Sequence, residues 1–374
     1  MGLWSNKLPQ STLIKSFVIL LLLAAVTYVI YASSVPVPVE TVKTRLILST
    51  DFGEAGSSNS SLHIEFKDFR LNYDFDRLPY NFTDRCNFVG TKAKVTSLIF
   101  VVSSASEKQN REDLRNLWAN VNESKHLQDT SARIFFLLGK GNASDQSIQE
   151  EANKYDDMII ADVEDTYRNL VFKTAIILQL ATTVCTTATF VHKIDDDVVF
   201  HIDKFFDHVG KDFIPNTTGI YGYVRTKTPP FRDPKNKWYI SWAQFSGKVY
   251  PPFVTGSSYV MNTKTAQILY RALPYFPLIN LEDVMITGII SEAISVPRIA
   301  LESLFLPSAN LKFVCPGTVI SIHGVKTTRF YERVWECMKK PQSANHIFYP
   351  SHTDTQIVQK VPRIFRNGAR HSPG

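Results

Sequence analysis

Short apolar runs alternate with amphipathic segments between residues 95 and 194, and this alternation constrains the fold more than any other feature of the sequence. Buried-type strands are predicted at 95–102, 133–138, 158–161 and 189–194. Helical patterns are predicted at 107–120, at 145–154 and along a long helix around 170–181, which Asp165 is expected to cap. Strands separated by helices are typical of a mostly parallel sheet that helices cover, so we predict an α/β domain.

One long apolar run, residues 17–32, lies near the N-terminus, and no charged residue occurs between Lys15 and Glu40. This length is just enough to cross a bilayer as a helix. Basic residues but no acidic ones precede the run, so the positive-inside rule places residues 1–16 in the cytosol and the rest of the chain in a lumen. A cleaved signal peptide is the alternative, because residues 32–34 are small, but the run exceeds a usual signal core.

Two further features agree with an oxidising lumen. Five Asn-x-Ser/Thr sequons occur, at Asn59, Asn81, Asn122, Asn142 and Asn216. The four cysteines are Cys86, Cys185, Cys315 and Cys337. They form no C-x-x-C pair, so they favour two disulfides over a zinc site, with three connectivities open.

The chain is expected to divide into a membrane anchor, a spacer and one globular domain. Residues 33–84 contain a Gly/Ser-rich stretch and are predicted to form a stem, residues 85–340 the globular domain, and residues 341–374 a polar tail. The net charge of +6 comes from scattered basic residues and not from a concentrated stripe. Nucleic acid is therefore not an expected partner.

Three adjacent carboxylates, Asp195, Asp196 and Asp197, follow the strand predicted at 189–194. Adjacent anions repel one another unless a cation compensates them, and a hard divalent ion that also binds substrate phosphates would do so. The carboxyl end of a strand in an open α/β sheet is also where ligands usually bind. An acidic turn that caps the next helix is the structural alternative.

Three other features are weaker when each is taken alone. Glu282 and Asp283 precede an apolar segment and can begin a helix, where acidic residues are common for structural reasons. Gly256 lies among small residues after a Pro-Pro turn and suits a close backbone approach to a ligand. His323 ends an apolar run, and by itself it would be a structural histidine.

In combination and in order, these elements resemble glycosyltransferase family 31, the β1,3-galactosyl- and N-acetylglucosaminyltransferases with their Fringe-like relatives. The resemblance extends from Lys94 to Met338. The motifs that carry it are Arg111-x-x-Leu114-Arg115-x-Leu117-Trp118, Phe135-Phe136-Leu137-Leu138-Gly139, Asp165-Thr166-Tyr167-x-Asn169-Leu170-x-x-Lys173-Thr174, Lys193-x-Asp195-Asp196-Asp197-Val198, Tyr250-Pro251-Pro252 with Gly256, and Glu282-Asp283-Val284.

The resemblance implies a GT-A nucleotide-sugar domain that uses Mn²⁺ and inverts the anomeric centre of a UDP-sugar. It implies that Asp197 is a metal ligand, with His323 as a second one, and that Asp283 is the catalytic base. Asp195 and Asp196 would face the nucleotide. The other residues expected on the nucleotide side are Arg111, Arg115, Lys173 and Gly256.

The expected activity is transfer of galactose or N-acetylglucosamine from its UDP derivative to a glycan on a protein or lipid, in β1,3 linkage. The expected location is the Golgi membrane, with the catalytic domain in the lumen. One alternative is an inactive lumenal relative that binds glycans or acts as a chaperone, and another is a carbohydrate-binding module without a nucleotide site. The intact carboxylate triplet, Asp283 and His323 argue against the first alternative, and the triplet also disfavours the second.

Overall fold

The computed structural model describes residues 46–49, 61–64, 80–81, 95–140, 146–207, 217–301, 304–309 and 319–340. The chain divides into two units, Met1–Arg45 and Leu46–Gly374, and all of these residues belong to the second. The predicted cytosolic tail, the anchor 17–32 and the C-terminal tail 341–374 lie outside the described residues. Within the described ranges, no helix is long and apolar enough to cross a membrane.

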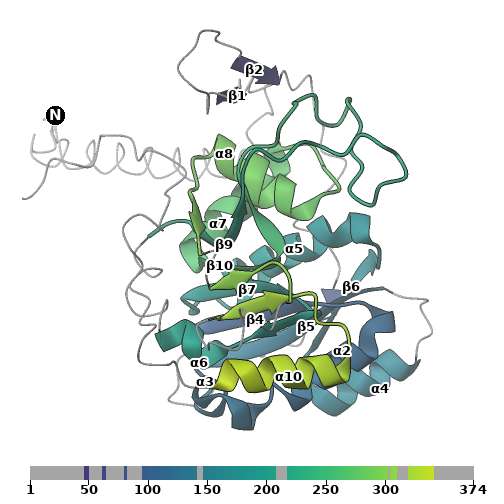
Figure 1. Ribbon diagram of the computed structural model, residues 1–374, viewed down its shortest axis with the longest axis vertical. Helices are drawn as coiled ribbons and strands as arrows, with labels where there is room; N and C mark the ends of the chain where they lie inside the picture. Colours follow the sequence, from purple (N-terminus) through teal and green to yellow (C-terminus); the bar gives the residue numbers. More distant parts are fainter. Residues whose placement is uncertain are drawn as a thin grey trace, which may run out of the picture. The chain divides into compact units, whose positions relative to one another are not determined.

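An eight-stranded sheet forms the centre of the domain, in the order β11-β9-β10-β7-β4-β5-β6-β3 (Figure 1). Its strands are β3 (Tyr80–Asn81), β4 (Ser97–Val102), β5 (Ala132–Lys140), β6 (Met158–Glu164), β7 (Phe190–Asp195), β9 (Ile220–Arg225), β10 (Phe253–Asn262) and β11 (Arg298–Ala300). Strands β7, β4, β5 and β6 are parallel, which confirms the four predicted strands and their parallel arrangement.

The flanks of the sheet depart from the parallel pattern. Strand β10 runs antiparallel to both β7 and β9, and β3 runs antiparallel to β6. The connection from β9 to β10 contains no helix, and antiparallel neighbours need no helical crossover. Strands β1 (Leu46–Ser49) and β2 (Ser61–Ile64) form a separate antiparallel pair. These two strands and β3 fall within the segment predicted to be a stem.

Helices cover both faces of the sheet. The longer ones are α2 (Lys108–Asn116), α4 (Gln146–Tyr155), α5 (Leu170–Gln179), α7 (Thr263–Ala272) and α10 (Thr328–Lys339). Figure 1 shows α2, α4 and α10 on one face, with α5 and α7 on the other. Along β4, Ile99 and Val101 pack towards the first group, whereas Leu98 and Phe100 pack towards the second. This alternation is the period-two pattern of a strand buried on both faces.

The shorter elements connect these layers. They are η2 (Ala105–Glu107), η3 (Val121–Glu123), α3 (Lys125–Gln128), η4 (Tyr167–Asn169), η5 (Leu180–Val184), α6 (Ile202–Phe205), η7 (Leu273–Tyr275), η8 (Val284–Ile290) and α8 (Ser291–Ala293). A small second sheet has the order β12-β13-β8, with β8 (Val198–Phe200), β12 (Phe305–Leu306) and β13 (Ser321–His323).

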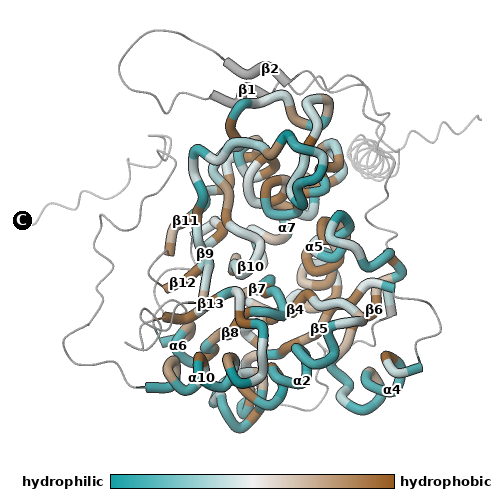
Figure 2. The backbone as a smooth tube through the Cα atoms, turned by 45° about the vertical axis from the view of Figure 1, so that its right-hand side comes forward, coloured by the Kyte–Doolittle hydropathy of each residue, from teal (hydrophilic) through white to brown (hydrophobic). Residues whose placement is uncertain are grey.

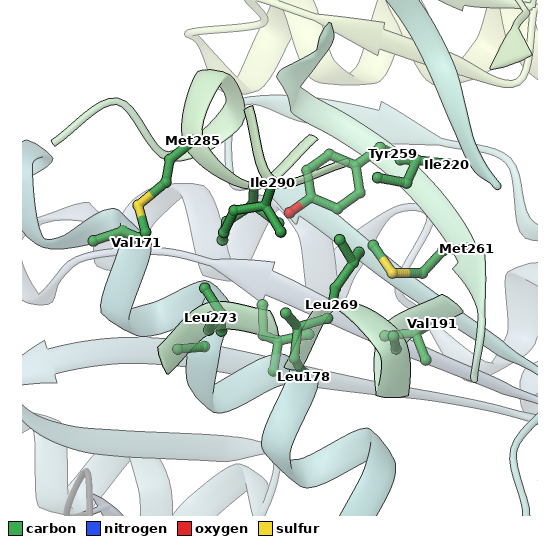
Figure 3. Close-up of a cluster of buried hydrophobic side chains, with 14 of the residues drawn as sticks. Val171, Leu178, Val191, Ile220, Tyr259, Met261, Leu269, Leu273, Met285 and Ile290 are labelled. Atoms are coloured by element: carbon green, nitrogen blue, oxygen red, sulfur yellow. The ribbon is translucent and has the colours of Figure 1, made fainter. Parts of the chain in front are cut away.

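Helix α5 is the most buried of the longer helices. Figure 2 shows it as mostly hydrophobic, in contrast to the hydrophilic α4. Figure 3 shows Val171 of α5 beside Met285 of η8, and Leu178 of α5 beside Leu269 of α7. Tyr259 of β10 belongs to the same core cluster. All five side chains are fully buried or nearly so. Burying a large apolar side chain contributes roughly 1.5–3 kcal/mol. This cluster therefore helps to hold α5 in the same core as the site-bearing strand β10.

The prediction that Asp165 caps the long helix is wrong. The 3₁₀ turn η4 precedes α5, and the cap residues of the two elements are Thr166 and Asn169. The Asp165 carboxylate instead accepts the Gly139 amide (3.1 Å) and the Lys173 ammonium (2.5 Å). A charged partner binds a carboxylate more strongly than a helix amide does, so Asp165 joins β5 to α5.

Of the four cysteines, Cys185 and Cys337 lie in the described part of the chain, and neither is a free thiol. Cys86 and Cys315 lie outside it. The pairing of the four cysteines in two disulfides therefore stays a prediction.

Candidate active site

The three acidic residues form the turn between β7 and β8. Strand β7 ends at Asp195, and β8 begins at Val198. Strand β8 pairs antiparallel with β13 in a register that sets His323 opposite Val198. This long-range pairing brings the His323 ring to the turn, where its Nε2 lies 3.3 Å from Oδ1 of Asp197.

The backbone around His323 fixes which ring nitrogen faces the turn. Nδ1 lies 3.0 Å from the carbonyl oxygen of Pro307, and a carbonyl can only accept, so Nδ1 carries the hydrogen. The next residue, Gly324, has a φ of 86°, which favours glycine, and its amide donates to the Asp197 carbonyl over 3.0 Å. Burial lowers the pKa of His323, but the Asp197 carboxylate outweighs it, and the net shift is upward.

Asp195, Asp197 and His323 together can hold a metal ion. One ligand atom from each of the three lies within 4.8 Å of the others. Carboxylate oxygens suit Mg²⁺ and Mn²⁺, and a neutral imidazole extends the range to transition metals. This donor set fits a divalent ion that keeps open positions for substrate oxygens. Asp195 was expected only to face the nucleotide, but the structure adds it to the possible metal ligands.

Asp196 points in a different direction from its two neighbours. Its Oδ2 accepts the Ser103 hydroxyl over 2.6 Å, and its carbonyl accepts the Tyr331 hydroxyl over 2.7 Å. Burial raises the pKa of Asp196 to about 7. The Ser103 hydrogen bond opposes this rise, whereas the charges of Asp195 and Asp197 add to it. The structure thus separates Asp196 from the three possible ligands and uses it to attach the turn to the end of β4 and to α10.

The three basic residues predicted on the nucleotide side are bound to protein partners. Arg111 is fully buried and donates to both carboxylate oxygens of Glu151, at 2.8 and 2.7 Å, and to Ser103 at 3.0 Å. Lys173 donates to the Ser103 carbonyl at 2.8 Å, and burial lowers its pKa. Both side chains therefore support Ser103, the residue that holds Asp196.

Arg115 lies further from the acidic turn. Its guanidinium donates to both carboxylate oxygens of Asp157 at 2.8 Å and to Glu151 at 2.7 Å, and it stacks on the ring of Tyr155 at 4.0 Å. This bidentate, stacked geometry joins α2 to the α4–β6 connection. Arg115 therefore shares Glu151 with Arg111, but its own hydrogen bonds go to Asp157 and Glu151 and not to the acidic turn.

Asp283 is held at the start of η8 by two backbone amides. Its Oδ2 accepts the Gly256 amide over 3.0 Å, and its Oδ1 accepts the Val284 amide over 2.8 Å. Thr287 attaches this helix start to β10, because its hydroxyl lies 2.8 Å from the Val254 carbonyl and 2.6 Å from the Asp283 carbonyl. Burial raises the pKa of Asp283, and the two amides oppose that shift.

Gly256 approaches Glu282 and Asp283 more closely than a larger residue could. A Cβ atom on Gly256 would lie 3.0 Å from Oε2 of Glu282 and 3.4 Å from Cβ of Asp283. The register of β10 against β9 also shifts between Val254 and Tyr259, where small residues lie. Such bulges redirect side chains and backbone groups next to active sites.

Lys193 and Glu282 connect the two parts of the site, and neither was among the predicted site residues. The Lys193 ammonium binds the Asp195 carboxylate and the Gly256 carbonyl, and it lies 3.9 Å from Oε2 of Glu282. Glu282 accepts the hydroxyls of Tyr259 (2.7 Å) and Thr174 (3.0 Å). Burial raises the pKa of Glu282 to about 7, although Lys193 opposes that rise. The sequence does contain a sign of this link, because Lys193 is a charged residue inside a strand that is predicted to be buried.

The fold and these contacts define a class of protein. An α/β sheet presents a cluster of possible metal ligands at the end of β7, and a separate, half-buried carboxylate stands at the start of η8. One carboxylate group can hold a metal while the other exchanges a proton. This division of roles is that of a metal-assisted group-transfer enzyme.

Comparison with known proteins identifies the family. The galactosyltransferase family profile matches residues 109–302, and the chain belongs to this family, which places it in glycosyltransferase family 31. It is therefore a glycosyltransferase by descent, as the sequence motifs implied.

Its relatives carry consistent names. Beta-1,3-galactosyltransferase bre-2 of Caenorhabditis elegans is 26% identical over 299 residues, which cover 78% of this chain and 80% of that protein. Beta-1,3-galactosyltransferase 1 of Mus musculus is 28% identical over 229 residues, covering 58% of this chain and 69% of the relative. Beta-1,3-galactosyltransferase 5 of Gorilla gorilla gorilla is 28% identical over 235 residues, with coverage of 61% and 77%.

Proposed function

We propose that this protein is an inverting β1,3-glycosyltransferase that transfers galactose or N-acetylglucosamine from a UDP-sugar to a glycan acceptor. The observation that carries the proposal is the separation of its carboxylates. Asp195 and Asp197 converge with His323, whereas Asp283 is held apart by the amides of Gly256 and Val284. The family membership and the names of the relatives support the same chemistry.

Asp195, Asp197 and His323 would hold a divalent ion, which we propose to be Mn²⁺. Such an ion supplies Lewis-acid stabilisation to the diphosphate as it leaves the anomeric carbon. The protein's part is to hold the ligand atoms in place. Lys193 does so through Asp195, and the amides of Gly324 and Val325 do so through the Asp197 carbonyl.

Asp283 would remove the proton from the acceptor hydroxyl as that oxygen attacks the anomeric carbon. A carboxylate that acts on the face opposite the leaving group yields inversion, and general base catalysis contributes roughly 10²- to 10⁴-fold. The two amides hold the Asp283 carboxylate in one orientation. It therefore needs little reorganisation when it accepts the proton.

We further propose that the apolar run at 17–32 anchors the chain in the Golgi membrane with the catalytic domain in the lumen. The absence of charge between Lys15 and Glu40 and the basic residues before the run support this topology. An N-terminal anchor would keep the site close to glycans on lumenal proteins and lipids, the proposed acceptors.

The test uses the full-length protein in detergent with Mn²⁺ and either UDP-galactose or UDP-N-acetylglucosamine. We expect Mn²⁺-dependent hydrolysis of one donor, and transfer when a glycan acceptor is added. An inactive glycan-binding relative would hydrolyse neither donor. Loss of activity on chelation and its recovery with Mn²⁺, but not with Ca²⁺, would identify the ion.

Asp197→Ala should weaken Mn²⁺-dependent UDP binding by about tenfold or more, because a hard cation loses an anionic ligand. Calorimetry with and without Mn²⁺ measures this change. Asp162→Ala is the matched control, since Asp162 is exposed on β6 and pairs with Lys140. Equal UDP affinity in Asp197→Ala and the wild type would exclude Asp197 as a ligand.

A further inference from the structure

Residues 226–252 form a long excursion between β9 and β10 that exposes several large aromatic rings (Figure 1, the teal-green loop). The exposed fractions are 44% for Phe231, 47% for Trp238 and 60% for Trp242. Phe231 and Trp238 pack against each other, with ring centroids 5.4 Å apart. Aromatic rings gathered on a surface in this way mark a binding site more often than a solvated loop.

The excursion is held in one conformation by its own hydrogen bonds. Arg232 donates to the carbonyls of Ile240 (2.9 Å), Phe245 (2.7 Å) and Gly247 (2.9 Å). The Tyr250 amide donates to the Thr228 carbonyl over 2.9 Å, which closes the base of the excursion. The aromatic rings are therefore presented by an ordered scaffold, and a ligand would meet a preformed surface.

The excursion contacts η4 and η8, the helix that begins directly after Asp283. On one side, Lys237 lies 4.2 Å from the centre of the Tyr167 ring in η4. Burial, with the negative charge of Asp283 as the next contribution, raises the pKa of Tyr167. On the other side, a Cβ atom on Gly288 of η8 would lie 3.8 Å from the carbonyl oxygen of Pro251 and 3.9 Å from that of Pro252, so the end of the excursion packs beside the helix that begins after Asp283.

Tyr250, at the end of the excursion, supplies an independent sign of a ligand. Its side chain is 5% exposed and packs on Phe245, with ring centroids 4.9 Å apart. Its hydroxyl has no hydrogen-bond partner within the described residues. A buried hydroxyl without a partner is costly, and it raises the expectation of a ligand group at that point. Burial raises the pKa of this hydroxyl to about 12; the charge of Arg232 opposes the rise, and that of Asp283 adds to it.

A pyranose fits these features chemically. One face of the ring consists of C–H groups that pack on an aromatic face, and its rim carries hydroxyls that both donate and accept hydrogen bonds. The sugar beside Asp283 must be the acceptor, because a base contacts the hydroxyl that it deprotonates. The donor's diphosphate belongs at the separate cluster of Asp195, Asp197 and His323.

We propose that Trp238, with Phe231 packed against it and Tyr167 beside the adjacent Lys237, is the platform on which the acceptor sugar stacks, and that the Tyr250 hydroxyl bonds a hydroxyl of that sugar. This subsite rests on the proposed transferase function and names the residues that select its acceptor. The excursion between β9 and β10 then determines which acceptor sugar binds, whereas the metal cluster serves to bind the donor.

The test compares full-length Trp238→Ala, Trp238→Phe and Tyr250→Phe with the wild type. Saturation-transfer NMR with methyl β-galactopyranoside and methyl β-N-acetylglucosaminide, in the presence of UDP and Mg²⁺, reports binding without turnover. Mn²⁺-dependent donor hydrolysis and the acceptor KM are measured in parallel. Tyr275→Ala is the control, since Tyr275 is exposed in η7 outside the excursion.

Trp238→Ala should abolish the saturation transfer and raise the acceptor KM by about tenfold, which is the worth of one aromatic stacking contact. Trp238→Phe should restore most of both. Tyr250→Phe should raise the acceptor KM by about fivefold, the worth of one hydrogen bond. Donor hydrolysis should change by less than about twofold in all variants, and Tyr275→Ala should match the wild type.

Three results would overturn the platform. The first is an unchanged acceptor KM in Trp238→Ala. The second is a rise in the donor KM alone, which would assign the rings to the donor sugar. The third is a wild type that hydrolyses the donor but shows no saturation transfer to either glycoside. A wild type that neither hydrolyses nor transfers any donor would overturn the proposed function itself.

Discussion

Glu282 and Asp283 are neighbours in the chain, but their side chains have different surroundings. Glu282 is buried, and its carboxylate is occupied by the hydroxyls of Tyr259 and Thr174. Asp283 is half-buried. Within the described residues, the hydrogen bonds to its carboxylate come only from two backbone amides. Only Asp283 therefore has room to accept a proton from a substrate, and Glu282 is a positioning residue.

Asp283→Asn should lower transfer by roughly 10²- to 10⁴-fold while UDP binding survives, because the amide keeps the size of the side chain but is not a base. Glu282→Gln should lower transfer far less, since its carbonyl oxygen can still accept the Tyr259 and Thr174 hydroxyls. Product assays at saturating donor and calorimetry with UDP and Mn²⁺ separate the two effects. A larger loss in Glu282→Gln than in Asp283→Asn would exchange the two roles.

Gly256→Ala tests the close approach of β10 to the base. The new Cβ would lie 3.0 Å from Oε2 of Glu282, so one of the two acidic side chains must shift. The shift needed is a few tenths of an ångström. A displacement of a positioned base by about 1 Å costs on the order of 10²-fold in rate, so a smaller loss is expected here. We expect kcat to fall while Mn²⁺-dependent UDP affinity is retained. The adjacent Ser257→Ala serves as the control, and equal kcat values in the two variants would contradict the close contact.

At the scale of elements, β7 carries both the turn that we propose to bind a metal and the buried cation that joins this turn to β10 and η8. Lys193 is 2% exposed, and its ammonium contacts Asp195, Gly256 and Glu282. A buried cation with two carboxylates and a carbonyl is well compensated. Removal of the cation leaves the buried Glu282 carboxylate, and the partly exposed Asp195 beside it, without that compensation.

Lys193→Met should therefore destabilise the fold by roughly 3–5 kcal/mol, the usual effect of removing one partner of a buried ion pair. Lys140→Met is the matched control, because the Lys140–Asp162 pair is half-exposed on both sides and such pairs contribute at most about 1 kcal/mol. Urea denaturation followed by tryptophan fluorescence measures both. Similar midpoints for the two variants would show that Lys193 does not stabilise the site.

For the whole molecule, the proposed topology predicts glycosylation of the chain in cells. Asn122 is exposed in η3 and begins one of the five sequons. We expect an N-glycosidase to increase the electrophoretic mobility of protein made in animal cells, and Asn122→Gln to reduce that increase by one glycan. An unchanged mobility after the enzyme treatment of wild-type protein would contradict a lumenal catalytic domain.

The sequence by itself determined the class of fold and the order of its central elements. Burial patterns along β4, β5, β6 and β7 are local, because a strand between two helical layers needs apolar residues at successive positions. The acidic turn at the end of β7 was also readable, since three adjacent carboxylates require compensation wherever they occur. The family resemblance then indicated Asp283 and His323, which no local pattern distinguishes from structural residues.

Only the tertiary structure decided what each charged residue does. Asp195, Asp196 and Asp197 are adjacent in sequence, but the pairing of β8 with β13 and the approach of Ser103 direct Asp196 away from the other two. Arg115 binds Asp157 because the fold packs α2 beside the α4–β6 connection. A charged side chain binds the partner that the fold brings within about 3 Å, and those partners come from distant parts of the chain. Local sequence patterns do not contain that information.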